Sequence, residues 1–119
     1  MQRRVVVTGM GLVTSVGIGV EQTWESLLAG RSGIDRITLF DATGFPSQIA
    51  GEVKGFDPEQ FIDKKEARRM DRFVQFGMAA ADMAMRMAGF DAPLEGEAAE
   101  RFATILGSGI GGLRTLEEE

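Results

Sequence analysis

The sequence predicts an α/β fold with a mostly parallel sheet and flanking helices. Two apolar runs lead to this prediction, residues 4–8 and 102–106, and each is followed by a glycine-rich turn and a helical pattern. Runs that are apolar on both faces are typical of strands covered on each side, and strands that alternate with helices favour parallel pairing. The third observation is a long amphipathic stripe over residues 70–88, which predicts a helix between the two runs.

The first run is expected to be a central strand, because its three consecutive valines are β-branched and apolar. Glycines 9 and 11 end it. A helix is expected next, with an apolar stripe on the face toward the core and Gly30 just past its C-terminus. The stripe consists of Val20, Trp24, Leu27 and Leu28.

The middle of the chain alternates between loop and helix signals. Residues 41–46 read as a loop, and residues 48–53 as a short edge strand. Asp57 before Pro58 predicts one helix start, and Asp63 with Glu66 predicts a second as a capping box. We expect this second helix to continue through the long stripe, with small residues at Gly77 and 79–81 that allow another element to approach closely.

Residues 102–106 predict a second buried strand, the glycine loop 107–112 follows it, and Leu113 begins a further helix. The 119 residues are enough for one small domain. A net charge of -5 argues against binding to nucleic acid or to a membrane surface, since both require a basic excess. The absence of Cys and His removes disulfides, thiolate sites and Ser/His/Asp catalysis, and no metal site or cofactor is expected.

The N-terminus resembles a secretory signal, because Arg3 and Arg4 precede a mostly apolar run. Four glycines within that run and the continuing pattern at Trp24 argue against a signal. No apolar run reaches the roughly 20 residues that a membrane span requires. The expected location is the cytoplasm.

The glycine loop has two interpretations. Gly107, Gly109 and Gly112 match G-x-G-x-x-G, and a strand, loop and helix in that order suit a dinucleotide site. The matching acidic residue would lie beyond position 119, so nothing in the chain confirms this reading. The alternative is a tight turn that lets a strand and a helix pack closely.

A basic cluster stands out on this acidic chain. On a continuous helix the cluster would occupy one arc of about 140°. It would then suit an acidic partner, although a solvated face with Glu66 and Asp71 as local ion-pair partners would fit as well. The cations are Lys64, Lys65, Arg68, Arg69 and Arg72.

Five stretches, in order, resemble the N-terminal region of the β-ketoacyl-acyl carrier protein synthases, particularly the KAS II branch. Each stretch is a weak signal on its own, but together the five cover the chain from end to end. They are residues 3–11 (RRVVVTGMG), 24–34 (WESLLAGRSGI), 40–41 (FD), 65–73 (KEARRMDRF) and 107–112 (GSGIGG).

This resemblance implies the first part of a thiolase-like fold and an acyltransferase of fatty acid biosynthesis. In the family, an active-site Cys accepts an acyl group, and two His residues help malonyl-acyl carrier protein decarboxylate and condense with it. All three lie beyond residue 119 in the family pattern, so no catalytic residue is assigned here and the chain alone is expected to be inactive.

The resemblance also implies roles for residues within the chain. The family's acidic acyl carrier protein docks on a basic helix that matches Lys65, Arg68 and Arg69, with Lys64 adjacent. Ile110, beside Gly109, matches the residue that lines or gates the acyl pocket at the family's dimer interface. The full-length family member is expected to be a homodimer.

Three alternatives remain open at this point. The chain could belong to a Rossmann-type oxidoreductase, and its continuation would then supply an acidic residue in place of a cysteine nucleophile. It could belong to a type II polyketide ketosynthase, whose opening looks similar. It could also be a non-catalytic carrier-binding module, although its apolar strands would then lack neighbours and expose edges prone to aggregation.

Overall fold

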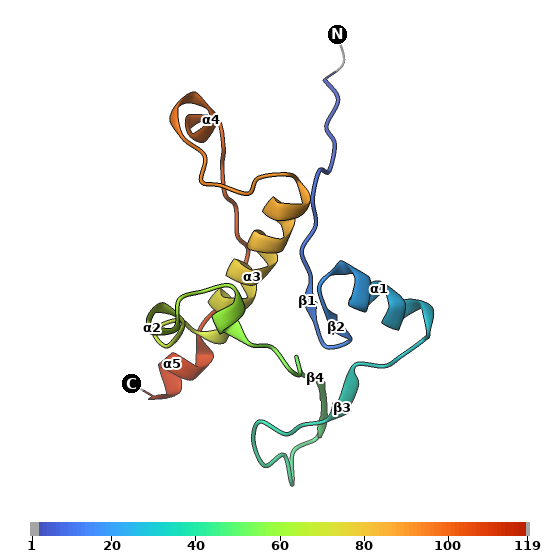
Figure 1. Cartoon of the computed structure of the whole chain (residues 1–119). Helices are drawn as coiled ribbons and strands as arrows, with labels where there is room; N and C mark the ends of the chain where they lie inside the picture. The colour runs from blue at the N-terminus through green and yellow to red at the C-terminus, as the bar shows by residue number, and fades with distance from the viewer. Residues whose placement is uncertain (1–2, 119) are drawn as a thin grey trace. The chain divides into compact units, whose positions relative to one another are not determined.

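The computed structural model describes residues 3–118 and divides into two compact units (Figure 1). Unit 1 consists of Met1–Gly11 and Pro58–Glu119, and unit 2 consists of Leu12–Asp57. No helix in the described part is long and apolar enough to cross a membrane. Every candidate site residue predicted from the sequence belongs to unit 1.

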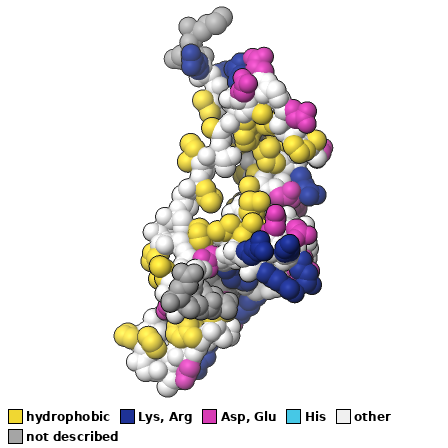
Figure 2. All heavy atoms as spheres, turned by 90° about the vertical axis from the view of Figure 1, so that its left-hand side faces the viewer, with side chains coloured by type: hydrophobic (Ala, Val, Ile, Leu, Met, Phe, Trp, Pro, Cys, Tyr) yellow, Lys and Arg dark blue, Asp and Glu magenta, His cyan; other side chains and the backbone are white. Residues whose placement is uncertain are grey.

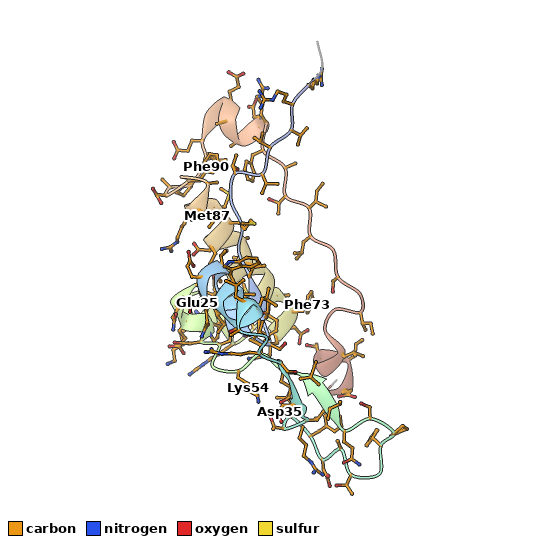
Figure 3. All side chains as sticks on the ribbon, turned by 90° about the vertical axis from the view of Figure 1, so that its right-hand side faces the viewer. Glu25, Asp35, Lys54, Phe73, Met87 and Phe90 are labelled. Atoms are coloured by element: carbon orange, nitrogen blue, oxygen red, sulfur yellow. The ribbon has the colours of Figure 1, made fainter. Side chains whose placement is uncertain are left out.

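Unit 2 contains two small antiparallel sheets and one helix. Its elements are β1 Val13–Thr14, β2 Gly17–Ile18, α1 Val20–Leu28, β3 Ile34–Arg36 and β4 Ile49–Gly51. The predicted edge strand at 48–53 is confirmed as β4, whose partner β3 the sequence did not predict. Lys54 forms an ion pair with Asp35 of β3 at 2.8 Å, and Figure 3 shows the two side chains together.

Helix α1 forms where it was predicted, but the prediction for its apolar face is wrong. The two buried residues of the helix are Thr23 and Ser26, while Trp24 is 59% exposed and Leu28 is 70% exposed. Thr23 faces the β1–β2 hairpin, where its hydroxyl lies 3.5 Å from that of Thr14. The hairpin therefore covers the small polar face, and Trp24, Leu27 and Leu28 of the apolar stripe are left on the surface.

Protonation of Glu52 is expected to loosen the connection between β3 and β4. Its carboxylate accepts hydrogen bonds from the Thr38 hydroxyl (2.7 Å) and from the N–H groups of Thr38 (2.9 Å) and Leu39 (3.2 Å). These bonds, that from the Thr38 side chain first, hold the pKa of Glu52 below its ordinary value of 4.5. Because the folded pKa is depressed, the stabilising effect is complete above the unfolded pKa and is lost as the pH falls through the folded one.

The amide chemical shifts of Thr38 and Leu39, followed by NMR through the acid range, should therefore titrate with an apparent pKa below 4.5. Glu52→Gln should abolish this titration, because the amide keeps an acceptor oxygen but cannot ionise. A midpoint at or above the ordinary value would contradict the prediction.

Unit 1 is built around one long helix. Its elements are the 3₁₀ turn η1 Pro58–Gln60 and the helices α2 Lys64–Ala67, α3 Arg72–Met87, α4 Gly96–Glu100 and α5 Leu113–Glu118. Ile62, Ala67 and Ala79 are its most buried apolar residues. The predicted helices at 70–88 and from Leu113 are confirmed. The predicted helix after Asp57 is a 3₁₀ turn instead, and α4 was not predicted.

The expected continuous helix from Asp63 to Ala88 is wrong, because the chain breaks between α2 and α3. Asp63 caps α2 as predicted, accepting from the N–H of Lys65 at 2.8 Å. The side-chain amide of Gln75 donates to the carbonyls of Ala67 (2.8 Å) and Met70 (3.3 Å), which satisfies acceptors freed at the break. Asp71, with φ -60° and ψ 154°, is extended and starts α3. The break is thus held by a contact from the next helix.

The N-terminal segment crosses α3 at close range. A Cβ on Gly9 would overlap the backbone carbonyl of Ala84, and a Cβ on Gly11 would overlap that of Ala80. Only glycine permits this approach, since any other residue would force the two segments apart. The prediction that small residues of this helix admit a close neighbour is confirmed at Ala80.

Residues 102–106 also run beside α3. The methyl groups of Leu106 lie 3.4 Å from the position that a Cβ on Gly77 would take. The rings of Phe90 and Phe102 meet edge to face with centroids 6.1 Å apart. Gly77 therefore provides the second close approach that the sequence predicted.

The strands predicted at 4–8 and 102–106 are not present in the structure. Figure 1 shows both segments as extended chain, but neither belongs to a sheet. Val5 is 95% exposed and Ile105 is 94% exposed. The sheets that do form are two-stranded and antiparallel, so no parallel sheet is seen in the described residues. A strand needs a partner for its backbone N–H and C=O groups, and residues 3–118 supply none for either segment.

Candidate functional site

The predicted docking residues gather around α2. Figure 2 shows Lys and Arg side chains grouped over this region, with Asp and Glu beside them. We define the basic surface as the four exposed cations of α2 and the turn after it. They are Lys64, Lys65, Arg68 and Arg69.

The break after α2 changes the predicted arrangement of the cluster. Arg68 is the C-cap residue of α2, and Arg69 lies in the turn that follows. Arg72 lies on α3, where its guanidinium stacks 4.9 Å above the ring of Phe76. The five cations therefore do not share one continuous helical arc, because Gln75 stabilises a turn within it.

Within residues 3–118, most of the cations of the basic surface have no ion-pair partner. Lys64 pairs with Glu59 at 3.1 Å. Lys65, Arg68 and Arg69 form no ion pair with any side chain that the structure describes. Glu66 and Asp71, the partners that a solvated face would use, also make no ion pair with these cations in that part of the chain. The arrangement is suited to an external anion, because three exposed positive charges lie within five consecutive residues.

The glycine loop 107–112 is held only at its C-terminal end. Gly111 has φ +80°, and the ring of Phe73 lies 3.6 Å from the position that its Cβ would occupy. A Cβ on Gly112 would overlap the carboxylate of Asp71. Gly109 has open space around it, and Ile110 is 73% exposed. The predicted gate residue therefore stands out from the surface of this chain, next to the anchored end of the loop.

Asp71 and Phe73 are the residues that the sequence analysis missed. Both lie in the KEARRMDRF stretch that supports the family resemblance, but Asp71 was considered only as a local ion-pair partner of the cations, and Phe73 was given no role. The structure brings them to the glycine loop, with Asp71 Oδ2 accepting a hydrogen bond from the Thr115 hydroxyl at 2.8 Å. The first turn of α3 thus connects the end of the basic surface to the loop.

The same geometry disfavours a nucleotide site at the loop. A pyrophosphate group requires backbone N–H donors and a positive field at the glycines. Here a carboxylate lies against Gly112, and its negative charge would repel a phosphate group. Within residues 3–118, no group of three Asp or Glu side chains could hold a metal ion.

A sequence model of the family described as "Beta-ketoacyl synthase, N-terminal domain" matches residues 2–119. The chain belongs to the β-ketoacyl synthase family. It is 51% identical over 116 residues to 3-oxoacyl-acyl-carrier-protein synthase 2 of Vibrio cholerae, covering 98% of this chain and 28% of that protein. It is 47% identical over 115 residues to the protein of the same name from Staphylococcus aureus strain N315, covering 97% of this chain and 27% of that protein.

Among solved structures, the ishigamide ketosynthase/chain length factor is similar to this β-ketoacyl synthase chain with a TM-score of 0.68 and 45% sequence identity. The match covers 75% of this chain and 22% of that chain. Similarity to a ketosynthase agrees with the thiolase-like fold that the sequence resemblance implied. This β-ketoacyl synthase chain spans little more than a quarter of the curated relatives it matches.

Proposed function

We propose that the chain is the N-terminal part of a chain-elongating β-ketoacyl-acyl carrier protein synthase of fatty acid biosynthesis. The reaction joins a malonyl unit, with loss of CO₂, to an acyl group held as a thioester on the enzyme. Membership of the family and the relatives named 3-oxoacyl-acyl-carrier-protein synthase 2 support this proposal. The observation that carries it within the structure is that Lys65, Arg68 and Arg69 make no ion pair with any side chain described in residues 3–118.

Within the enzyme, the basic surface would dock the acyl carrier protein that delivers acyl and malonyl groups. An acidic carrier would be steered to these three cations, and the attraction would weaken with added salt. Ile110, with Gly109 beside it, would line and gate the acyl-chain pocket. A β-branched apolar side chain next to unhindered glycine can contact an alkyl chain and still move aside.

The finer fold proposal is that residues 4–8 and 102–106 become strands of a mostly parallel sheet once the remainder of the enzyme is present. Both segments are apolar, extended and exposed, and their backbone groups have no sheet partner within residues 3–118. Burial of such segments against further chain would stabilise the enzyme by about 25 cal/mol per Å² of apolar surface. We further propose that the enzyme acts in the cytoplasm as a homodimer.

The full product of the gene that encodes this chain should release CO₂ from malonyl-acyl carrier protein in the presence of acyl-acyl carrier protein. The β-ketoacyl product should be one acetate unit longer than the acyl substrate. The 119-residue chain assayed in parallel should be inactive, because it contains no Cys or His. Repeated condensation on one primer would indicate a polyketide ketosynthase. Binding of a nicotinamide dinucleotide without condensation would overturn the proposal.

A further inference from the structure

Asp71 does not use its side chain in the way that its position predicts. It is the N-cap residue of α3, where an aspartate carboxylate ordinarily accepts from an N–H group of the first helical turn. No such side-chain bond is present. Instead the backbone carbonyl of Asp71 accepts from the N–H groups of Val74 (3.0 Å) and Gln75 (3.1 Å). The half-buried carboxylate is directed at the glycine loop.

There the carboxylate makes two contacts with the segment after Ile110. Oδ2 accepts the hydrogen bond from the Thr115 hydroxyl, and the same oxygen occupies the space that a Cβ on Gly112 would need. Thr115 lies on α5, so one side chain at the start of α3 joins the loop to the helix that follows it. A hydrogen bond to a charged acceptor is stronger than one between neutral groups.

On the other side of Ile110 the loop is exposed. Gly107 and Gly109 have no heavy atom within 4 Å of their Cβ positions, whereas the positions on Gly111 and Gly112 meet Phe73 and Asp71. Gly111 is the single residue between Ile110 and the Asp71 contact. The direction of the Ile110 side chain is therefore set from its C-terminal side.

We propose that Asp71, through Thr115 and Gly112, is a positioning residue that fixes the orientation of Ile110 and thereby the acyl chain length that the enzyme prefers. This inference rests on the proposed function, because Ile110 must line the acyl pocket for its orientation to matter. Loss of the hydrogen bond would let the anchored end of the loop move, and Ile110 would then close the pocket less selectively.

The test uses the full gene product with acyl groups on a small pantetheine thioester, so that carrier docking does not enter. The readout is the ratio of kcat/KM for a long and a short acyl primer. Thr115→Val should change this ratio roughly tenfold, comparable to what a pocket gains or loses through one or two methylene contacts. Thr115→Ser keeps the hydroxyl and should restore the wild-type ratio.

Asp71→Ala removes the acceptor of the same hydrogen bond. It replaces Thr115→Val as the test variant if Thr115→Val does not fold. The Asp71→Ala/Thr115→Val double variant should change the ratio no more than Asp71→Ala alone, because Asp71→Ala has already removed the hydrogen bond that Thr115→Val breaks. If the changes that the two substitutions cause in this ratio multiply in the double variant, the inference is wrong. It is also wrong if Thr115→Val has the wild-type ratio.

Ile110→Ala separates this inference from the proposed function. If Ile110→Ala shifts the chain-length ratio and Thr115→Val does not, the inference is wrong and the gate is supported. If Ile110→Ala leaves the ratio unchanged, both the gate and the inference are wrong. Condensing activity in all variants would still uphold the proposed reaction.

Discussion

Replacing Lys65, Arg68 and Arg69 together by alanine is expected to lower kcat/KM for acyl-acyl carrier protein roughly tenfold to a hundredfold. Each exposed pair with an acidic carrier should contribute up to about 1 kcal/mol, and three together also set the rate of encounter. These cations make no ion pair with any side chain described in residues 3–118, so their removal breaks none. Lys64 is left in place because it pairs with Glu59.

The substrate and the salt concentration separate docking from other effects. The same variant should act normally on an acyl-pantetheine thioester, which has no acidic carrier to dock. The wild-type enzyme should lose its advantage over the variant as salt is raised, because exposed charges are screened over about 10 Å at 0.1 M ionic strength.

A matched control removes the same charge elsewhere. Arg3, Arg4 and Arg31 are exposed, lie outside the basic surface and make no ion pair with a side chain described in residues 3–118, and alanine at all three also lowers the net charge by three. Equal losses in the two triple variants would mean that net charge acts at long range. The docking assignment would then be wrong.

Gly11→Ala is expected to destabilise the protein by about 1–3 kcal/mol, the usual cost of forcing extra volume into a packed contact. The new Cβ would overlap the carbonyl oxygen of Ala80, which is part of the α3 backbone and cannot move aside as a side chain could. The thermal midpoint of the full gene product, measured by calorimetry, should fall accordingly.

Gly107→Ala provides the control for the glycine substitution itself. Nothing lies within 4 Å of a Cβ at this position, and no positive φ is present there. The variant should therefore have a thermal midpoint close to that of the wild type. If Gly11→Ala is equally harmless, the N-terminal segment does not cross α3 as closely as the structure shows.

Several elements could be predicted because their signals are local. The long helix and its end follow from apolar spacing and from Gly89, which has φ +83° just after the C-cap residue Ala88. Asp63 caps α2 because its side chain reaches an N–H group only two residues away. Capping and periodicity involve neighbours in the sequence, so they can be predicted without knowledge of the rest of the fold.

The errors arose where a distant residue decides the outcome. The predicted helix is interrupted at 68–71 by a turn, where the side chain of Gln75 bonds the carbonyls of Ala67 and Met70; helix propensities take no account of such side-chain contacts. Residues 4–8 have a strong β preference, but a strand exists only when a second segment pairs with it. The apolar stripe of α1 was assigned to the core because periodicity shows which residues share a face, not which face a neighbouring element covers.

The same distinction between local signals and tertiary contacts applies to the candidate site. Its cations and Ile110 could be named from the sequence, because five stretches in order resemble one family. The contacts of Asp71 and Phe73 with Gly111, Gly112 and Thr115 could not be predicted, since they join residues that are distant in the chain.

The amino-acid sequence by itself thus determined the family, the local helices and the chemical character of the basic surface and the glycine loop. Only the tertiary structure decided where the helix breaks, which cations remain unpaired and which side chain holds the loop. The physical reason is the range of the forces involved. Helix periodicity and capping act within a few residues, whereas pairing, packing and the contact between Asp71 and Thr115 depend on segments that meet only after the chain has folded.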